Sequence, residues 1–161
     1  MIELNDRQTA DSFHRSYAAV DGLWCTKVEE KYGFDIALDI DNEVFKVKPK
    51  IQARKLKELA NIGNEIEALF QCLTTKLTLE GYSYRAERIG NDGSFRIIIN
   101  ECPWHNTMVR SGREQLPPKV GSRICSTEYS VWASEFSDNI QFEQECRTCE
   151  GSESCTIQFR H

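Results

Sequence analysis

Apolar residues in the first part of the chain recur at the spacing of a helix. Five of them stand three or four positions apart: Phe13, Tyr17, Val20, Trp24 and Val28. Residues at this spacing share one face of an α-helix. Gly33 follows where such a helix can end, so the pattern predicts a long amphipathic helix from about Thr9 to Tyr32.

Helical spacing continues beyond Gly33. A second apolar pattern runs from Asp35 to Pro49, where the proline ring removes a backbone donor and should stop or kink the helix. The segment "KIQARKLKELANIG" resumes it. Asn64 can cap a further helix that ends before Gly81. We therefore expect residues 1–81 to form a helical half.

The period of the pattern changes at Tyr82 from helical to alternating. The segments "YSYRAERI" and "SFRIIIN" flank the turn residues "GNDG", which predicts a β-hairpin with Phe95, Ile97 and Ile99 on one face. A short helix in "CPWHNTMVRSGREQL", a chain break at "PPKVG" and a helix in "STEYSVWASEF" should follow. The last two strands are "NIQFEQEC" and "SCTIQFR". The expected fold is α+β, a single domain over 1–161 whose helical half packs on one face of an antiparallel sheet formed by residues 82–161.

Charge and composition narrow the function classes. The chain has a net charge of −5 and a pI near 5.3, so it lacks the positive electrostatic field that is typical of a nucleic-acid-binding protein. No apolar run approaches the roughly 18 residues that a membrane-spanning helix needs, and "MIELNDRQTADSF" has no targeting pattern. We therefore expect a cytoplasmic protein that binds neither nucleic acid nor membrane, with its seven cysteines reduced.

Five of these cysteines are expected to gather in one place. Alternation along the last two strands puts Cys146 and Cys155 on the inward face, and Cys149 stands in the turn between them. Cys102 leaves the end of another strand, and Cys125 opens the last helix. Converging thiols are suited to soft metals, so zinc and an iron–sulfur cluster are the candidate cofactors.

Three roles remain open for these thiols. A four-sulfur metal site would use four of the five, and Cys125, which follows the expected chain break, is the one we predict to be spare. A catalytic role would make Cys125 or Cys155 a nucleophile with Glu128 or His105 as base. The third role is plain core, which is our prediction for two further residues, Cys25 and Cys72.

Two parts of the sequence resemble known families. "VDGLWCTKVEEKYGFDIALDID" is similar to the DGLWF and VEE.YG.D signature of a small family from anaerobic archaea and bacteria, and "NECPWH", "EYSVWASEF" and "CRTCEGSESCTIQF" resemble that family's C-terminal half. More distantly, Cys102, Cys125 with Glu128, and "GSESCTIQF" look like the C-terminal pattern of L-2-amino-thiazoline-4-carboxylate hydrolases. The same ending is similar to that of 4-vinyl-reductase-type small-molecule-binding domains.

These observations lead to two expectations of function. The first is a cytoplasmic small-molecule- or metal-binding domain with a clustered-cysteine site. The alternative, which the distant resemblance implies, is a hydrolase acting on a small cyclic amidine or thiazoline-like substrate through a cysteine nucleophile. The long helical N-terminal half also favours a third possibility, a purely structural interaction module, and a stable homodimer would support it.

Overall fold

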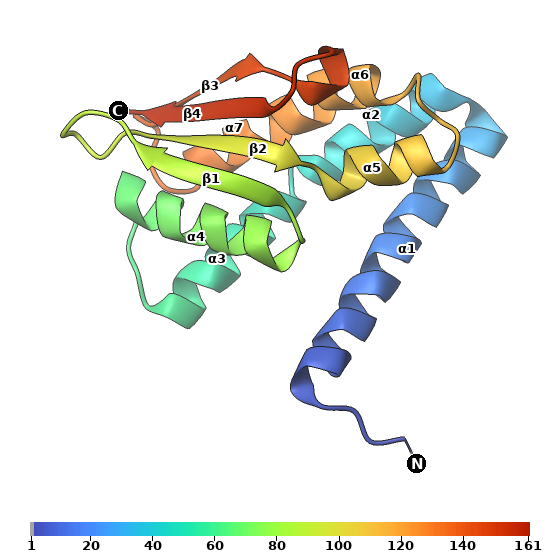
Figure 1. Ribbon diagram of the computed structural model, residues 1–161, viewed down its shortest axis with the longest axis horizontal. Helices are drawn as coiled ribbons and strands as arrows, with labels where there is room; N and C mark the ends of the chain where they lie inside the picture. Colours follow the sequence, from blue (N-terminus) through green and yellow to red (C-terminus); the bar gives the residue numbers. More distant parts are fainter. Residues whose placement is uncertain (1) are drawn as a thin grey trace. The chain divides into compact units, whose positions relative to one another are not determined.

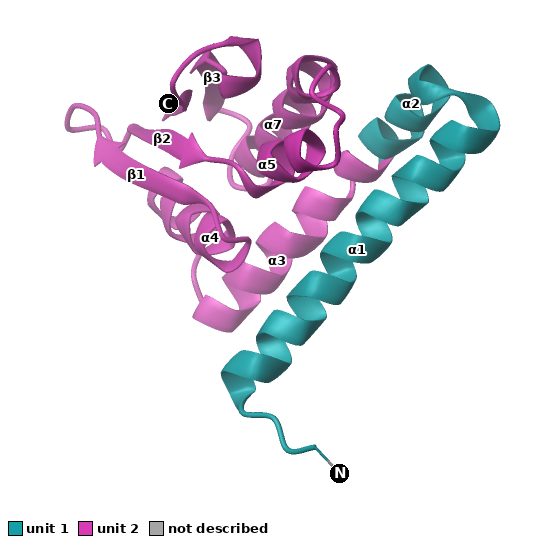
Figure 2. Ribbon diagram, turned by 45° about the vertical axis from the view of Figure 1, so that its right-hand side comes forward, with its two compact units in different colours: residues 1–43 teal, residues 44–161 magenta. Residues whose placement is uncertain are grey.

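A computed structural model describes residues 2–161, and the chain divides into two compact units, residues 1–43 and 44–161 (Figure 2). Helices dominate the N-terminal part, and an antiparallel sheet with further helices follows (Figure 1). The expected α+β class is therefore confirmed.

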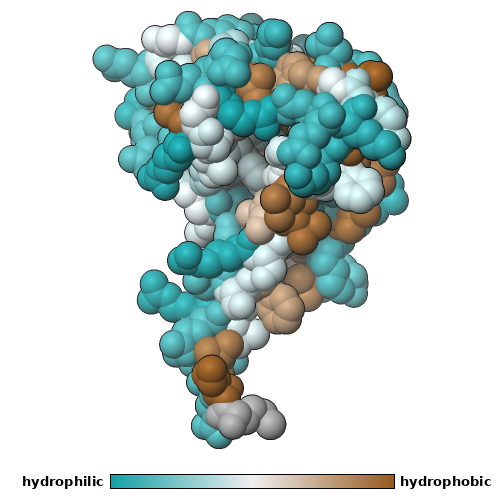
Figure 3. Space-filling model, turned by 90° about the vertical axis from the view of Figure 1, so that its right-hand side faces the viewer, coloured by the Kyte–Doolittle hydropathy of each residue, from teal (hydrophilic) through white to brown (hydrophobic). Residues whose placement is uncertain are grey.

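The first unit holds the helix α1 (Asp6–Tyr32) and most of α2 (Phe34–Phe45). The α1 helix begins with a capping box: the side chain of Asn5 accepts from the backbone of Gln8, and the side chain of Gln8 accepts from the backbone of Asn5. The predicted helix is thus confirmed with an earlier start. Its apolar stripe, however, stays at the surface, and among the residues described for α1 none is buried (Figure 3).

The second unit opens with two helices, α3 (Lys48–Ala60) and α4 (Ile66–Leu79). Pro49 stands in the first turn of α3, where the missing backbone donor costs nothing, so the predicted helix break is confirmed. The predicted cap at Asn64 is wrong: Glu65 precedes α4, and the side chain of Asn64 instead accepts a hydrogen bond from Lys57.

Four antiparallel strands form the sheet, in the order β1-β2-β4-β3. They are β1 (Ser83–Arg88), β2 (Phe95–Glu101), β3 (Gln141–Cys146) and β4 (Cys155–Arg160). The hairpin β1–β2 and the two final strands match the predicted ones. Because β4 pairs with both β2 and β3, the chain must cross from β2 to β3 through the helices between them.

These connecting helices correct one prediction. After α5 (Pro103–Arg110), the chain does not break at "PPKVG" but forms α6 (Pro117–Val120), a π-helical turn η1 (Gly121–Cys125) and α7 (Ser126–Ser134) without interruption. Pro117 is tolerated because it occupies the first helical position, where no backbone donor is needed. Cys125 therefore does not open a helix. It lies inside a continuous helical segment over residues 117–134.

The core of this unit lies between the sheet and the helices α4 and α7. Phe95, Ile97 and Ile99 on β2 face it, as predicted, together with Ile157 and Phe159 on the neighbouring strand. The largest fully buried side chains there are those of Trp132, Phe95, Phe159, Leu69, Leu73, Leu77, Ile97 and Ile157. Burying such side chains contributes about 1.5–3 kcal/mol each to folding, so this unit has a well-formed core.

Candidate functional site

Four of the five predicted thiols come together where β2 ends and β4 begins. Cys102 follows the last residue of β2 and Cys155 starts β4, so the pairing of these strands brings the two positions to the same end of the sheet. Cys125 ends η1, and Cys149 lies in the short 3₁₀ turn η2 (Thr148–Glu150) between β3 and β4. Figure 1 shows α5, α6 and the β3–β4 turn gathered at this end.

The charges of these four thiols affect one another. A negative charge on Cys155 would raise the pKa of Cys102, Cys125 and Cys149, and one on Cys102 would raise that of Cys125. In each case burial is the larger cause of the raised pKa. Three members, Cys102, Cys125 and Cys155, also pack against the hydrophobic core. The four thiols thus form one cluster in a poorly solvated place, which we call the cysteine cluster.

Cys146 stands apart from this cluster because of a β-bulge. Phe142 pairs with Phe159 and Gln144 with Ile157, a register that would place Cys146 opposite Cys155. The register shifts between Gln144 and Cys146, and Cys146 pairs with Thr156 instead. The predicted alternation within β3 is kept, since Cys146 is half-buried like Phe142 and Gln144, but its partner on β4 is not the one that an unbroken register would give. The thiol of Cys146 donates to the carbonyl of Ser154 at 3.2 Å, across the same hairpin.

The turn between β3 and β4 forms hydrogen bonds with the sulfur of Cys155. The backbone N–H of Thr148 donates to the sulfur of Cys155 at 3.1 Å, and the Thr148 hydroxyl lies 3.4 Å from the same sulfur. Gly151 closes the turn with a φ of 96°, as predicted. This amide, between Cys146 and Cys149, therefore faces Cys155. Arg147 lowers the pKa of Cys149, although burial and Cys155 outweigh it.

Cys102 lies at the amino end of α5. Burial raises the pKa of its thiol, while the backbone N–H of His105, the hydroxyl of Tyr82 and the backbone N–H of Trp104 oppose this rise. Donors of this kind at a helix start favour a thiolate. His105 thus touches the cluster through its backbone.

Cys125 lies deep in the cluster, beside Glu128. Burial, and then the carboxylate of Glu128, raise the pKa of its thiol far above the ordinary value for cysteine. No helix start lowers this pKa, because the helix runs through Cys125 and the backbone N–H groups are not free there. A strongly raised pKa leaves little thiolate at neutral pH.

A buried ion cluster adjoins the thiols, and sequence reasoning missed most of it. The amino group of Lys76, only 2% exposed, lies 3.1 Å from a carboxylate oxygen of Glu80 and 2.9 Å from one of Glu128. Burial opposes the charge of Lys76, but Glu128 and Glu80 more than compensate and raise its pKa. Glu128 is therefore neither a helix cap nor a solvated residue. The available signal was spacing: Lys76 stands three positions after the core residue Leu73.

Two tyrosines, Tyr82 and Tyr129, lie against the ion cluster, and a charge on Cys102 affects the pKa of both. The rings of Tyr82 and Tyr129 have centroids 5.1 Å and 5.9 Å from the amino group of Lys76. Burial raises the pKa of both phenols, and charges on Cys102 would raise both further. Both phenols therefore stay protonated at neutral pH.

A separate hollow of about 270 Å³ lies between α3 and α4. Its lining is formed by Leu56, Leu59, Ala60, Ile62, Gln71, Cys72 and Thr75. Cys72 is buried, as predicted for a core residue. The lining of the hollow is mostly apolar, with Gln71, Cys72 and Thr75 as its polar or thiol side chains.

Residues 2–161 contain neither a membrane-spanning helix nor a preformed metal site. No helix among them is both long and apolar enough to span a membrane. No three or more His, Cys, Asp or Glu side chains in this part of the chain are already arranged around a point where a metal ion could sit. The thiols of the cysteine cluster would have to turn toward a shared point before they could bind one.

Comparison with known proteins places the chain in a family. No curated protein matches the sequence. Residues 8–159, which include every member of the cysteine cluster and of the ion cluster, match the family described as "Family of unknown function (DUF6125)". Since the match covers nearly the whole chain, the protein belongs to this family.

Proposed function

We propose that the protein binds a soft metal, as zinc or an iron–sulfur cluster, through Cys102, Cys125, Cys149 and Cys155. The observation that carries the proposal is the mutual effect of these thiols on one another's pKa values in a buried place. Buried anions that repel one another are costly unless a cation joins them. A metal ion supplies that cation and takes up four sulfur ligands.

The surroundings support thiolate ligands. The N–H of Thr148 donates to the sulfur of Cys155, and the N–H groups of Trp104 and His105 lower the pKa of Cys102. Donors to ligand atoms orient the ligands and spread their negative charge. These three amides belong to two different turns, so both sides of the cysteine cluster are provided with donors.

The bulge between Gln144 and Cys146 changes which cysteine we expect to be spare. The thiol of Cys146 already donates to the carbonyl of Ser154, and its register position is opposite Thr156. The pKa of Cys125, in contrast, is raised by charges on the other three thiols, Cys102, Cys155 and Cys149. We therefore propose Cys146, rather than Cys125, as the cysteine that the site does without.

The hydrolase alternative receives less support. A cysteine nucleophile needs a lowered pKa and access to substrate, whereas burial and Glu128 raise the pKa of Cys125. The carboxylate of Glu128, proposed as a base, is held by Lys76. The remaining parts of the proposal are a cytoplasmic location, a small molecule as the bound species in place of or beside the metal, and no binding to nucleic acid.

Elemental analysis of protein purified without oxygen tests the proposal. We expect about one zinc ion, or the iron and sulfide of one cluster, for each chain. The absorption of Co²⁺ added to metal-free protein gives a second measurement, because sulfur-to-cobalt bands report thiolate ligands. Replacement of Cys102, Cys125, Cys149 or Cys155 by Ser should remove most of the bound metal, while Cys146→Ser keeps it.

The matched control is Cys146→Ser, because Cys146 lies in the same hairpin and is half-buried like the others. A protein with neither zinc nor iron that also gives no sulfur-to-cobalt bands would contradict metal binding. Equal loss of metal from Cys146→Ser and Cys155→Ser would contradict the assignment of the four ligands while leaving metal binding itself intact.

A further inference from the structure

We propose that α1 forms an antiparallel pair with α1 of a second copy of this chain, along a stripe made by Phe13, Val20, Leu23 and Trp24. This stripe is independent of the cysteine cluster, which lies in the other unit. The proposal rests on three properties of α1: the exposure of the stripe, the area that it offers, and the charges at its two ends.

The exposed stripe is unusual for a helix of this length. Phe13, Val20 and Trp24 are 74%, 67% and 66% exposed, and Leu23 beside them is 60% exposed. Phe13, Val20 and Trp24 stand seven and four positions apart, so their side chains project from the same side of the helix. Figure 3 shows apolar side chains at the surface of this helix. Most helices in proteins owe their stability to the packing of an apolar face, and this face has none among the described residues.

The stripe offers enough area for a weak dimer. A Phe or Trp side chain buries roughly 150–250 Å² when covered, and most of that area is exposed at Phe13 and Trp24. Together with Val20, Leu23 and the flanking polar groups, two copies would cover of the order of 1,000–1,200 Å², close to the lower limit for specific interfaces. We therefore expect a dissociation constant in the micromolar range.

Charges at the two ends of the stripe select the antiparallel arrangement. Asp6 stands seven positions before Phe13, and Lys31 stands seven positions after Trp24, so both charges lie on the side of the stripe. Asp6 and Lys31 are equally far from the point between Ala18 and Ala19, close to the middle of α1, as are Phe13 and Trp24. An antiparallel pair centred there places Phe13 beside the partner's Trp24 and Asp6 beside the partner's Lys31, twice in each dimer. A parallel pair would place like charges together.

The first test measures molecular mass by light scattering and sedimentation over a range of protein concentrations, under reducing conditions that exclude disulfide-linked dimers. We expect a reversible dimer. Trp24→Gln should raise its dissociation constant about tenfold or more, because aromatic residues dominate interfaces of this kind. The control Leu79→Gln removes a residue that is also 66% exposed, but on α4, and should leave the dissociation constant unchanged.

The second test reverses the charges. Asp6→Lys and Lys31→Asp should each raise the dissociation constant about three- to tenfold, and the double variant should restore it to within about twofold. Each single change also opposes the helix dipole, and the double variant opposes it twice. A restored dimer therefore reports a contact between the two residues and not a change in the helix.

A chain that remains monomeric at every concentration would overturn the proposal. If Trp24 in that monomer is also shielded from quenchers, the stripe packs against the chain's own second unit instead. Equal effects of Trp24→Gln and Leu79→Gln would place the dimer contact elsewhere. A double charge variant weaker than both single variants would overturn the antiparallel pairing.

Discussion

Gly121 and Cys149 are so close that a β-carbon on Gly121 would lie 2.6 Å from the sulfur of Cys149. The backbone of Gly121 is helical, with a φ of −61°, so any residue could adopt its conformation. Glycine therefore fits at position 121 because a larger residue would collide with Cys149. This contact brings the π turn that ends at Cys125 against the turn between β3 and β4, and it fixes how closely their thiols approach.

Replacement of Gly121 by Ala should displace Cys149 and disturb metal binding. A β-carbon at 2.6 Å from sulfur forces the Cys149 side chain to rotate or one of the two turns to move, and either change displaces the sulfur. We expect Gly121→Ala to keep less than about half of the bound metal, with a stability cost of about 1–3 kcal/mol. Metal content and the rate of alkylation at Cys149 provide the measurements.

The control for this change is Gly22→Ala. No described atom lies within 4 Å of a β-carbon built on Gly22, which stands inside α1, so alanine should raise helix stability by roughly 0.5–1 kcal/mol. Its metal content should equal that of the unchanged protein. Full metal content in Gly121→Ala would mean that the position of Cys149 does not matter for binding.

Replacement of Lys76 by Met should be strongly destabilising. Lys76 lies between two buried carboxylates, those of Glu80 and Glu128, and its loss removes the ammonium group that both contact. Removing one partner of a buried ion cluster typically costs about 3–5 kcal/mol. The measurement is the free energy of unfolding from urea titration at neutral pH.

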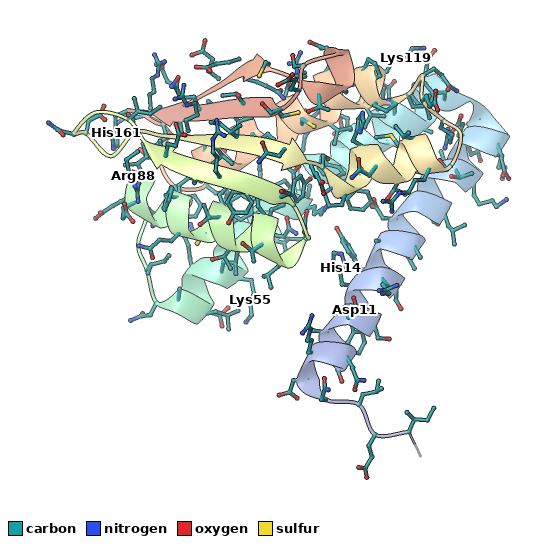
Figure 4. All side chains as sticks on the ribbon, in the orientation of Figure 1. Asp11, His14, Lys55, Arg88, Lys119 and His161 are labelled. Carbon is teal, nitrogen blue, oxygen red and sulfur yellow. The ribbon has the colours of Figure 1, made fainter. Side chains whose placement is uncertain are left out.

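The exposed pair Lys55–Glu58 provides the comparison, with the position of Lys55 labelled in Figure 4. Lys55→Met should change the free energy of unfolding by less than about 1 kcal/mol, because exposed ion pairs contribute little. A similar small effect from Lys76→Met would show that the buried carboxylates accept protons at little cost once the lysine is gone.

The elements of the fold could be predicted because local patterns determine them. Alternation of apolar residues placed Phe95, Ile97 and Ile99 in the core, and turn residues marked the first hairpin. Both signals act over only a few positions. The π turn at Gly121–Cys125 could not be predicted, since Pro117 reads as a breaker unless it is known to occupy the first position of a helix. Tertiary contacts decide between these two meanings.

The region where the candidate thiols gather was predictable, but their arrangement was not. Cys102 and Cys155 stand at strand ends, and the order of the strands brings them together, as expected. One bulge after Gln144 moved Cys146 out of register with Cys155. Nothing in the local sequence marks that bulge, and a shift of one residue is enough to change the partner of every residue beyond it.

Glu80 should make stability depend on acidic pH. Burial alone would raise the pKa of its carboxyl, but Lys76, Lys48 and the amide of Gln52 together lower it below the ordinary value. A group whose pKa is lowered by folding stabilises the protein above its unfolded pKa, near 4.3, and that contribution is lost as the pH falls through the folded value. The slope attributable to one such proton is at most about 1.4 kcal/mol per pH unit.

Glu80→Gln isolates this contribution, because glutamine cannot titrate. We expect the variant to be less stable than the unchanged protein at pH 7 and the difference between them to shrink below about pH 4. Urea unfolding at a series of pH values gives the comparison. A constant difference from neutral to acidic pH would mean that folding does not change the pKa of Glu80.

Cys72 and Cys155 should respond differently to replacement by Ala, because one belongs to the core and the other to the proposed metal site. Cys72 is 2% exposed on α4, and its loss leaves a small cavity, so we expect a cost of roughly 1 kcal/mol with or without metal. Cys155→Ala should reduce the stability of the metal-loaded protein by more, since the free energy of metal binding adds to that of folding. In excess chelator this additional loss should disappear. If chelator changes the effect of both replacements equally, Cys155 contributes to the core and not to a metal site.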